Sequence, residues 1–367
     1  MELTTHMEKI AIVIGTRPDI IKMSPVIRAC QQKNVNFFII NTGQHYSYDM
    51  EKVFLDELSL PVPEYNLKVG SDTPGKQTAK IICRIEEVFN QEKPDCVLVL
   101  GDTNTTLGSA LAAAKLHIKI GHIEAGCRSY NQIMPEEINR IVTDHISDYL
   151  YVQSEIAKDI LINEGIPDEK IVISGNTIVD AIIQNKKSAL TKSDILTKLS
   201  IESSNYFLMT LHRQENVDIQ DRFELILQGI DQLSKKYNVP VIFPVHPRTE
   251  KMIHTYDIRI PDNVVCIKPL DYLDFIALES NAKLILTDSG GVQFEACILK
   301  VPCLTLRDET EIPESVKCGA NIVTGVDTQN IINSANQILS RDNTWINPFG
   351  DGHSGEQIID DIIKRLS

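Results

Sequence analysis

Acidic side chains follow apolar segments in the first half of the chain. Asp102 comes just after one apolar run, Glu124 ends another, and Glu136 opens a predicted helix over 136–146. The plain interpretation of Asp102 and Glu136 is that they cap helix N-termini. In an open α/β sheet, however, ligands bind beyond the carboxyl ends of the strands, so we expect the three carboxylates to converge on one sheet edge. Carboxylates grouped there could serve as general acid and base.

Apolar runs in the second half are followed by groups that suit phosphate. These groups are His212, His246, Arg307, Ser289, Gly290 and Gly291. The two glycines stand between a predicted strand and a predicted helix over 292–299, so backbone N–H groups and the helix dipole can hold a diphosphate. A glycine-rich turn alone is often only a tight turn, but its combination with the other groups favours a phosphate site.

Four further residues have positions that suggest a role. Glu295 lies one turn into the helix that follows the two glycines and could bond a ribose diol, although a solvated surface glutamate fits the sequence nearly as well. Arg17 and Lys22 would reach the phosphates from the first domain as extra cations. Arg140, one helical turn after Glu136, could pair with that carboxylate and keep it ionised.

Common cofactor and metal motifs are absent from the sequence. The turn 15–19 follows a strand without the glycine fingerprint of a dinucleotide site, so we expect no nicotinamide cofactor. Neither the Walker pattern nor a Gly-x-Ser-x-Gly elbow occurs. The nine histidines are dispersed, and His117 and His122 would face opposite sides of a strand, so we expect no metal site. The eight cysteines lack zinc or redox spacing and are interpreted as reduced core thiols.

Short runs rich in Val and Ile recur along the chain and are typical of buried parallel strands. They cover 9–15, 36–42, 96–102, 118–124, 149–154, 171–176, 206–212, 239–246, 263–269, 284–290, 302–308 and 321–325. Amphipathic segments of helix length, such as 19–33 and 221–236, separate them, which indicates βα units. The two sets of runs predict an α/β protein with two doubly wound domains.

A polar segment rich in lysine and serine, 178–201, is the best place for the junction between the domains. We predict an N-terminal Rossmann-like domain over 7–176, which carries the carboxylates, and a C-terminal Rossmann-like domain over 177–350, which binds the phosphates. The last segment, 351–367, has isoleucines at helical spacing. It is predicted to be a helix that could pack back on the N-terminal domain.

The 367 residues include 36 Lys+Arg and 50 Asp+Glu, which gives a formal net charge of −14. This acidic balance argues against a nucleic-acid partner, because phosphate neutralisation needs a basic face. No run reaches the roughly 18 uninterrupted apolar residues of a membrane span, and the first residues lack the apolar stretch of a signal peptide. We therefore expect a cytoplasmic protein with no membrane partner.

A series of short motifs runs through the chain in a fixed order. They are Gly15-Thr16-Arg17-Pro18, Lys22-Met23, Gln44-His45, Gly101-Asp102-Thr103, Gly121-His122-Ile123-Glu124-Ala125-Gly126, Pro135-Glu136-Glu137 with Asn139-Arg140, His212-Arg213, Pro244-Val245-His246-Pro247, Thr287-Asp288-Ser289-Gly290-Gly291 and Arg307-Asp308. The series resembles that of the non-hydrolysing UDP-N-acetylglucosamine 2-epimerases, from about Lys9 to Gly352. The resemblance implies two doubly wound Rossmann-like domains around a cleft, of glycosyltransferase-B type. It also implies a homodimer that needs no cofactor.

The resemblance further implies reversible interconversion of UDP-N-acetylglucosamine and UDP-N-acetylmannosamine, which would supply N-acetylmannosamine-type sugars for polysaccharide or glycan synthesis. The C2 proton is not next to a carbonyl, so departure of UDP from C1 would have to acidify it and leave 2-acetamidoglucal. The implied catalytic residues are Asp102, Glu124, Glu136, Arg140 and His212. The implied UDP-binding residues are Arg17, Lys22, His212, His246, Ser289, Gly290, Gly291, Glu295 and Arg307. Which carboxylate is the base stays open.

The chain departs from the family pattern at a few positions. Phe294 stands where bacterial members often have Glu, and Gln214 replaces the second Arg of a common His-Arg-Arg run. Many bacterial members bind a second UDP-N-acetylglucosamine as an activator near the segment that matches Gln44 and His45. An Arg expected after that segment is missing here, so activation by substrate stays open.

Alternative functions also fit parts of the sequence. One is a 2-epimerase for another UDP-sugar, such as a diacetamido uronic acid, and another is a glycosyltransferase, because function does not follow from fold. A non-catalytic nucleotide-sugar binder and a hydrolysing epimerase are the remaining two. The three carboxylates argue against the transferase and the binder, whereas the sugar substituents and the fate of the intermediate stay open.

Overall fold

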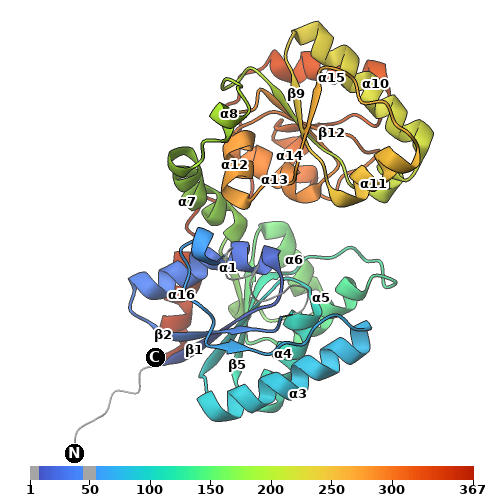
Figure 1. The fold of residues 1–367 in the computed structure, drawn as a ribbon. Helices are drawn as coiled ribbons and strands as arrows, with labels where there is room; N and C mark the ends of the chain where they lie inside the picture. The colour runs from blue at the N-terminus through green and yellow to red at the C-terminus, as the bar shows by residue number, and fades with distance from the viewer. Residues whose placement is uncertain (1–7, 44–54) are drawn as a thin grey trace, which may run out of the picture. The chain divides into compact units, whose positions relative to one another are not determined.

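The computed structural model describes residues 8–43 and 55–367 (Figure 1). Two compact units divide the chain: unit 1 comprises Met1–Ala181 and Phe349–Ser367, and unit 2 comprises Ile182–Pro348. Each unit holds one parallel sheet with helices on both faces, which confirms the predicted α/β class. In the described parts of the chain, no helix combines the length and apolar character needed to cross a membrane.

The described strands of unit 1 are parallel and lie in the order β3-β2-β1-β4-β5-β6-β7. They are β1 (Lys9–Ile14), β2 (Asn36–Asn41), β3 (Tyr65–Asn66), β4 (Cys96–Leu100), β5 (Lys119–Ala125), β6 (Tyr149–Val152) and β7 (Ile171–Ile173). From β1 the chain moves outward to β2 and β3, and then returns to β4 on the other side of β1. The carboxyl ends of β1 and β4 therefore flank the point where the strand order reverses, which is where doubly wound sheets bind ligands.

Helices cover both faces of this sheet (Figure 1). They are α1 (Arg17–Gln32), α3 (Pro74–Glu92), α4 (Asn104–Lys115), α5 (Pro135–Ile146), α6 (Glu155–Asn163) and α16 (Ser354–Leu366). Helix α16 packs so closely on α1 that a Cβ on Gly355 would lie 2.8 Å from the backbone of Pro25. On the opposite face, alternate residues of β1 and β4 such as Val13 and Val99 pack with Ile85 of α3.

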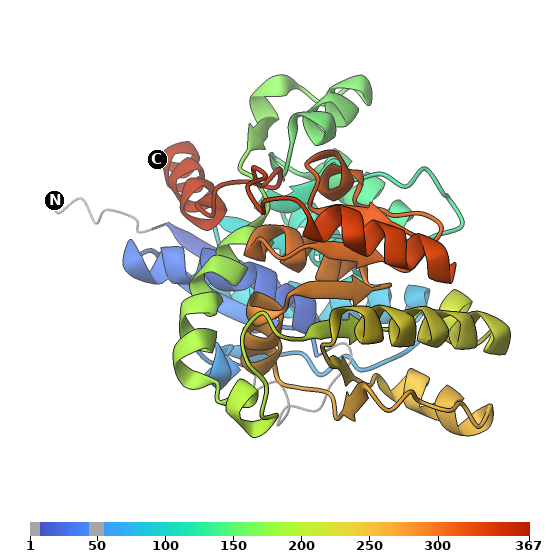
Figure 2. The same cartoon turned by 90° about the horizontal axis from the view of Figure 1, so that it is seen from above.

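Unit 2 has parallel strands in the order β10-β9-β8-β11-β12-β13. They are β8 (Phe207–Thr210), β9 (Val241–Pro244), β10 (Val264–Ile267), β11 (Leu284–Thr287), β12 (Cys303–Thr305) and β13 (Asn321–Val323). Its helices are α8 (Ile195–Lys198), α9 (Gln214–Val217), α10 (Gln220–Tyr237), α11 (Pro247–Thr255), α12 (Tyr272–Asn281), α13 (Gly290–Leu299), α14 (Pro313–Lys317) and α15 (Thr328–Leu339). Helices α10 and α15 pack against each other, and Figure 2 shows both from above. Here the strand order reverses between β8 and β11.

Two features add detail to the sequence expectation. Strand β3 has only two residues, too few for a pattern to predict. The polar segment 178–201 is largely helical, because α7 (Thr177–Lys192) and α8 occupy most of it. Helix α7 contains the boundary between the two units, at Ala181 and Ile182.

The turn after β1 requires glycine. A Cβ on Gly15 would lie 2.1 Å from Thr105 Oγ1 and 2.6 Å from Thr42 Oγ1. These hydroxyls are themselves hydrogen-bonded to each other at 2.7 Å. The contacts leave no room for a side chain at this position, and they fix the start of α1, where Arg17 stands.

Candidate active site

Glu124 occupies an irregular position at the carboxyl end of β5. Its φ is +66°, and the pairing of β5 with β6 shifts register between Ile123 and Ala125. A bulge of this kind re-aims a side chain, and a left-handed backbone at a non-glycine residue costs about 1–2 kcal/mol. Lys22 Nζ lies 2.8 Å from each oxygen of the Glu124 carboxylate. Strain of this kind is typical of functional sites.

Lys22 on α1 lies among three carboxylates of unit 1 and interacts electrostatically with each of them. Burial acts to lower its pKa, but Glu124, Asp102 and Asp19 together raise it above its ordinary value. The ammonium is therefore a shared counter-charge for carboxylates that come from three different parts of the sheet edge. The sequence predicted Lys22 as a cation for phosphates, and in the structure it stands beside the carboxylates of its own unit.

Asp102 is held by α5 at two points. Its Oδ2 accepts from Arg140 Nε at 2.9 Å and from Arg140 NH2 at 2.6 Å, and its backbone carbonyl accepts from Asn139 Nδ2 at 2.8 Å. Arg140 NH1 also donates to Glu137 at 2.8 Å. The expected pair of Arg140 with Glu136 is therefore wrong, because the guanidinium is taken up by Asp102 and by the neighbouring Glu137.

The two adjacent glutamates of α5 have different environments. Glu136 is exposed in the first helical turn, where a carboxylate also favours the helix dipole. Glu137 is buried and accepts from Ser129 N at 2.9 Å and Tyr130 N at 2.8 Å. Burial acts to raise the pKa of Glu137, but these donors and Arg140 lower it overall. Glu137 thus orders the loop before α5, while Asp102 and Glu124 lie around Lys22.

Asp19 shapes the turn that carries Arg17. Its Oδ2 accepts from Gly15 N at 3.1 Å and Thr16 N at 2.9 Å, and Thr16 caps α1 in return. Burial is the largest influence and raises the pKa of Asp19 to about 6. Arg17 is the first residue of α1 and is exposed, at a helix N-terminus where anions are favoured.

In unit 2 a pocket of about 230 Å³ lies at the carboxyl ends of the strands. Its lining includes His212, His246 and Ser289, three of the predicted residues, together with apolar Phe275 and Val292. The two imidazole rings lie 5.5 Å apart between centroids. The pocket therefore joins polar groups for a charged ligand to an apolar wall.

A buried carboxylate positions the first of these histidines. Asp288 accepts from the backbone N–H groups of His212 at 3.1 Å and Arg213 at 3.0 Å, and His212 Nδ1 lies 3.1 Å from its Oδ1. Asn216 Nδ2 adds a further donor at 3.2 Å. Burial acts to raise the pKa of Asp288, but these partners lower it overall, so it remains a carboxylate.

His246 is oriented by the helix that follows it. Its Nδ1 accepts from Arg248 N at 3.2 Å and so caps α11. Burial, His212 and Arg248 lower the pKa of His246, which favours the neutral ring. Because Nδ1 is the acceptor, the ring hydrogen is on Nε2, which can donate to a ligand.

The N-terminus of α13 has free space around its glycines. A Cβ on Gly290 or Gly291 would come no closer than 3.8 Å to another residue. Ser289 is the N-cap and makes no side-chain capping bond. An anion could therefore approach the first N–H groups of this helix closely, and the diphosphate expected there stays a prediction.

Arg307 is buried and ion-paired. Its Nε donates to Glu215 at 2.8 Å, and its NH1 donates to the two oxygens of Glu311 at 2.9 and 2.7 Å. Burial acts to lower its pKa, but the two glutamates raise it. The predicted diphosphate cation therefore already has two carboxylate partners in this structure.

Glu295 on α13 is partly buried and contacts a second acid. Glu279 on α12 is 0% exposed, and in the described part of the chain neither of its carboxyl oxygens has a hydrogen-bond partner. Burial is the main cause that raises the pKa of Glu295 to about 7 and that of Glu279 well above its ordinary value. Burial and the neighbouring acid both disfavour the charged form of Glu279, so this member of the pair holds a proton at neutral pH. The solvated surface position considered for Glu295 does not describe this environment.

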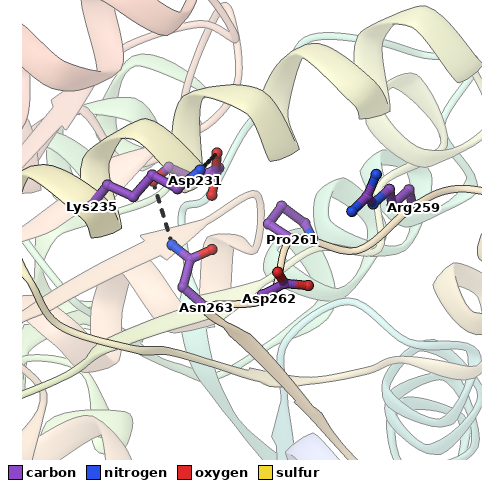
Figure 3. A pocket seen from close by; sticks show the side chains of 6 residues that line it. All are labelled: Asp231, Lys235, Arg259, Pro261, Asp262 and Asn263. Atoms are coloured by element: carbon purple, nitrogen blue, oxygen red, sulfur yellow. Dashed lines mark hydrogen bonds and ion pairs between the residues drawn. The ribbon is translucent and has the colours of Figure 1, made fainter.

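A different pocket, of about 330 Å³, lies at the other end of the unit 2 strands (Figure 3). Asn263, which precedes β10, donates to the Asp231 carbonyl at 3.4 Å, and Lys235 pairs with the Asp231 carboxylate at 2.6 Å. Its lining contains none of the predicted site residues.

Gln44 and His45, predicted for a second substrate molecule, lie outside the described residues. Within the described ranges, no three His, Cys, Asp or Glu side chains are grouped as metal ligands would be.

Several positioning residues escape sequence reasoning. Asp288, Glu137 and Glu279 were not predicted as site residues, and all three are buried acids that act through a neighbour. The sequence offers one signal for Asp288, since it stands directly before the glycine turn. For Glu137 and Glu279 the sequence offers only helical periodicity, which does not reveal a buried partner.

Comparison with known proteins gives consistent matches over nearly the whole chain. The family model for UDP-N-acetylglucosamine 2-epimerase matches residues 28–363. The chain is 50% identical to the UDP-N-acetylglucosamine 2-epimerase of Methanocaldococcus jannaschii, over 96% of this chain and 98% of that protein. It is 40% identical to the UDP-2,3-diacetamido-2,3-dideoxy-D-glucuronate 2-epimerase of Pseudomonas aeruginosa, over 98% of this chain and 99% of that protein. The crystal structure of the M. jannaschii enzyme in complex with UDP-GlcNAc and UDP aligns with a TM-score of 0.83 at 50% identity, covering 97% of this chain and 99% of that one.

Proposed function

Because the chain belongs to the UDP-N-acetylglucosamine 2-epimerase family and is therefore an isomerase, we propose that it interconverts UDP-N-acetylglucosamine and UDP-N-acetylmannosamine. The observation that carries this proposal is the pair of carboxylates, Asp102 and Glu124, around the ammonium of Lys22. Proton transfer at carbon needs positioned acids and bases of this kind. The product would supply N-acetylmannosamine-type sugars for polysaccharide or glycan synthesis.

The reaction would proceed by elimination and re-addition. As the C1–O bond breaks, its electron pair leaves on the UDP oxygen and positive charge develops at C1, which acidifies the C2–H bond. A carboxylate removes the C2 proton, and the C–H electron pair forms the C1=C2 bond of 2-acetamidoglucal. Protonation of C2 from the other face and return of the UDP oxygen to C1 give the epimer. We assign the acid–base group to Asp102, Glu124 and Glu136, which would also stabilise the oxocarbenium-like charge.

We assign UDP to unit 2. The pocket of His212, His246 and Ser289, with the open N-terminus of α13, supports this assignment. Donors aimed at the leaving diphosphate stabilise the charge that grows on it. Arg307 would exchange its contact with Glu311 for the diphosphate. The remaining assigned residues are Gly290, Gly291, Glu295 for the ribose, and Arg17 from unit 1.

The decisive experiment is proton NMR of the purified protein with UDP-N-acetylglucosamine in D2O, without added cofactor. We expect UDP-N-acetylmannosamine to appear with deuterium at C2. Accumulation of free UDP and N-acetylmannosamine would instead identify a hydrolysing epimerase. If UDP binds but neither an epimer nor exchange at C2 is seen, the proposed substrate is wrong.

A second candidate substrate is a UDP-2,3-diacetamido uronic acid. The 40% identity to the Pseudomonas aeruginosa enzyme named for that substrate supports it. The same NMR experiment with both sugars decides between them, because the preferred substrate will show the faster exchange of the C2 proton.

We further propose that the protein is a cytoplasmic homodimer. The family resemblance supports the dimer, and the eight free cysteines fit a reducing compartment. Sedimentation of the purified protein will show twice the chain mass of 41.2 kDa if the dimer forms.

A further inference from the structure

His122 on β5 is buried between two hydrogen-bond acceptors. Its side chain is 1% exposed, its Nδ1 lies 2.7 Å from Asp144 Oδ1, and its Nε2 lies 2.8 Å from the Gly101 carbonyl oxygen. A neutral imidazole has a hydrogen on only one ring nitrogen, so it would place a lone pair against one of these oxygens. Both contacts are favourable only when the ring is an imidazolium.

The proton cannot instead belong to Asp144. Asp144 Oδ2 accepts from Gly126 N at 3.2 Å and forms an ion pair with Arg128 NH1 at 2.7 Å. Burial acts to raise the pKa of Asp144, but His122 and Arg128 lower it overall, so it is a carboxylate. The positive charge therefore lies on the ring.

The groups that face the ring from each packed element favour this charge. Asp144 comes from α5, the Gly101 carbonyl from the turn after β4, and Glu124 from the same strand as His122. Burial is the largest influence and acts to lower the pKa of His122, but these three together raise it. The residues in register on the two neighbouring strands, Val99 and Leu150, are apolar and carry no charge.

The Gly101 carbonyl is the part of the site that this contact controls. Gly101 has a φ of +68°, and its backbone N–H donates to Ile123 O at 2.9 Å. Its backbone carbonyl is bound by His122, so both polar groups of Gly101 are held by residues of β5. The next residue is Asp102, whose carboxylate is bound by Arg140. A peptide plane that rotated at Gly101 would change the direction in which Asp102 leaves the strand.

We propose that His122 is a positioning residue for epimerisation, which as an imidazolium fixes the Gly101 peptide and thereby aims the Asp102 carboxylate at the sugar. This inference rests on the proposed function. Helix α5 then holds the turn at three points: Asp144 through His122, Asn139 on the Asp102 carbonyl, and Arg140 on the Asp102 carboxylate.

The ring's charge can be tested without substrate. Protein labelled with ¹⁵N in histidine is examined by NMR, with the His122 signals assigned by their loss in His122→Gln. We expect both ring nitrogens of His122 to carry hydrogens at a pH above the ordinary histidine pKa of about 6.5. A neutral ring at neutral pH would overturn the inference, whatever the enzyme's substrate proves to be.

The positioning role is tested by kinetics of His122→Gln beside a matched control. His117 is exposed near the start of β5 with a φ of +59°, which asparagine tolerates, so His117→Asn should leave turnover unchanged. We expect His122→Gln to lower kcat by tenfold or more, with KM and the UDP dissociation constant within twofold. Equal kcat, or parallel losses of kcat, UDP affinity and melting temperature, would overturn the role.

Asp144→Asn gives a second test if His122→Gln fails to fold. The imidazolium is lost as pH rises through its pKa, and removal of the Asp144 charge lowers that pKa. The alkaline limb of kcat should therefore move to lower pH than in the wild type. An unmoved limb would contradict the inference. If the wild type does not epimerise the UDP-sugars at all, the proposed function fails first and the positioning role fails with it.

Discussion

The ammonium of Lys22 on α1 lies 2.8 Å from both carboxylate oxygens of Glu124 at the end of β5. The two residues meet because β4 alone separates β1, which precedes α1, from β5 in the sheet. The Lys22 side chain is 28% exposed and that of Glu124 is 13% exposed, so the pair is only partly shielded from solvent. The charge of Lys22 therefore serves the carboxylates of unit 1 in this structure.

Lys22→Met should affect turnover more than binding. We expect kcat to fall by about tenfold or more, because the acid–base group loses its counter-charge, while the UDP dissociation constant changes less than twofold. Lys33→Met, at the other end of α1 and in a surface ion pair with Asp360, is the matched control and should behave as wild type. A loss of UDP affinity as large as the loss of kcat would assign Lys22 to the diphosphate.

Substitution of the proposed acid–base carboxylates should separate chemistry from binding. Asp102→Asn and Glu124→Gln should each lower kcat by about a hundredfold or more, since general acid–base groups contribute on that scale. Titration calorimetry should show UDP binding unchanged. Glu86→Gln, an exposed site on α3, serves as the control. Reduced UDP affinity would show that these residues hold ligand rather than transfer protons.

Glu136→Gln tests the exposed member of that group. If Glu136 acts on the sugar, kcat falls by about tenfold or more with UDP affinity retained. Wild-type turnover would restrict the acid–base group to Asp102 and Glu124. Glu137→Gln is the informative comparison, because it should lower the melting temperature by releasing the loop at Ser129 and Tyr130.

The carboxyl pair of Glu279 and Glu295 predicts a stability that falls as pH rises. The pKa of Glu295 is raised by burial from 4.5 to about 7, so the folded state holds a proton that the unfolded chain has released. The free energy of unfolding contributed by this group therefore falls between about pH 4.5 and about pH 7. Glu279→Gln removes one of the two acids whose pKa is raised, and with it the charge that faces Glu295, so its melting temperature should fall less over this range. Scanning calorimetry measures the slopes, with exposed Glu309→Gln as control. Equal slopes for Glu279→Gln and wild type would contradict the raised pKa of Glu279.

Gly15→Ala should destabilise unit 1. The added Cβ would overlap Thr105 Oγ1 and Thr42 Oγ1, and overpacking of this kind costs about 1–3 kcal/mol. Gly75→Ala, where a Cβ meets nothing within 4 Å in the first turn of α3, should be neutral or slightly stabilising. Denaturant unfolding of the two variants measures the difference, and equal free energies of unfolding would refute the steric argument.

Much of the fold could be predicted from the sequence because strands of a parallel sheet are buried on both faces. Such strands appear as near-continuous apolar runs, and every run predicted as a strand overlaps one, although β5 extends one residue past its run, to Ala125. The runs extend past several strands into the loops, as in 171–176, where β7 ends at Ile173. Ser174 and Asn176 in that loop are only 4% and 3% exposed, so they still pack although they have left the ladder.

For the candidate site, too, part could be predicted from the sequence and part depends on the tertiary structure. The sequence alone placed Asp102, Glu124, His212 and Ser289 at strand ends, because parallel strands end at one edge of their sheet. Only the tertiary structure decided which groups pair. Arg140 can reach a helical neighbour at either three or four residues' distance, and it selects Glu137 because Asp102 lies on the same side. Likewise the proton on His122 follows from two acceptors 22 and 21 residues away, and packing rather than local sequence brings them to one ring.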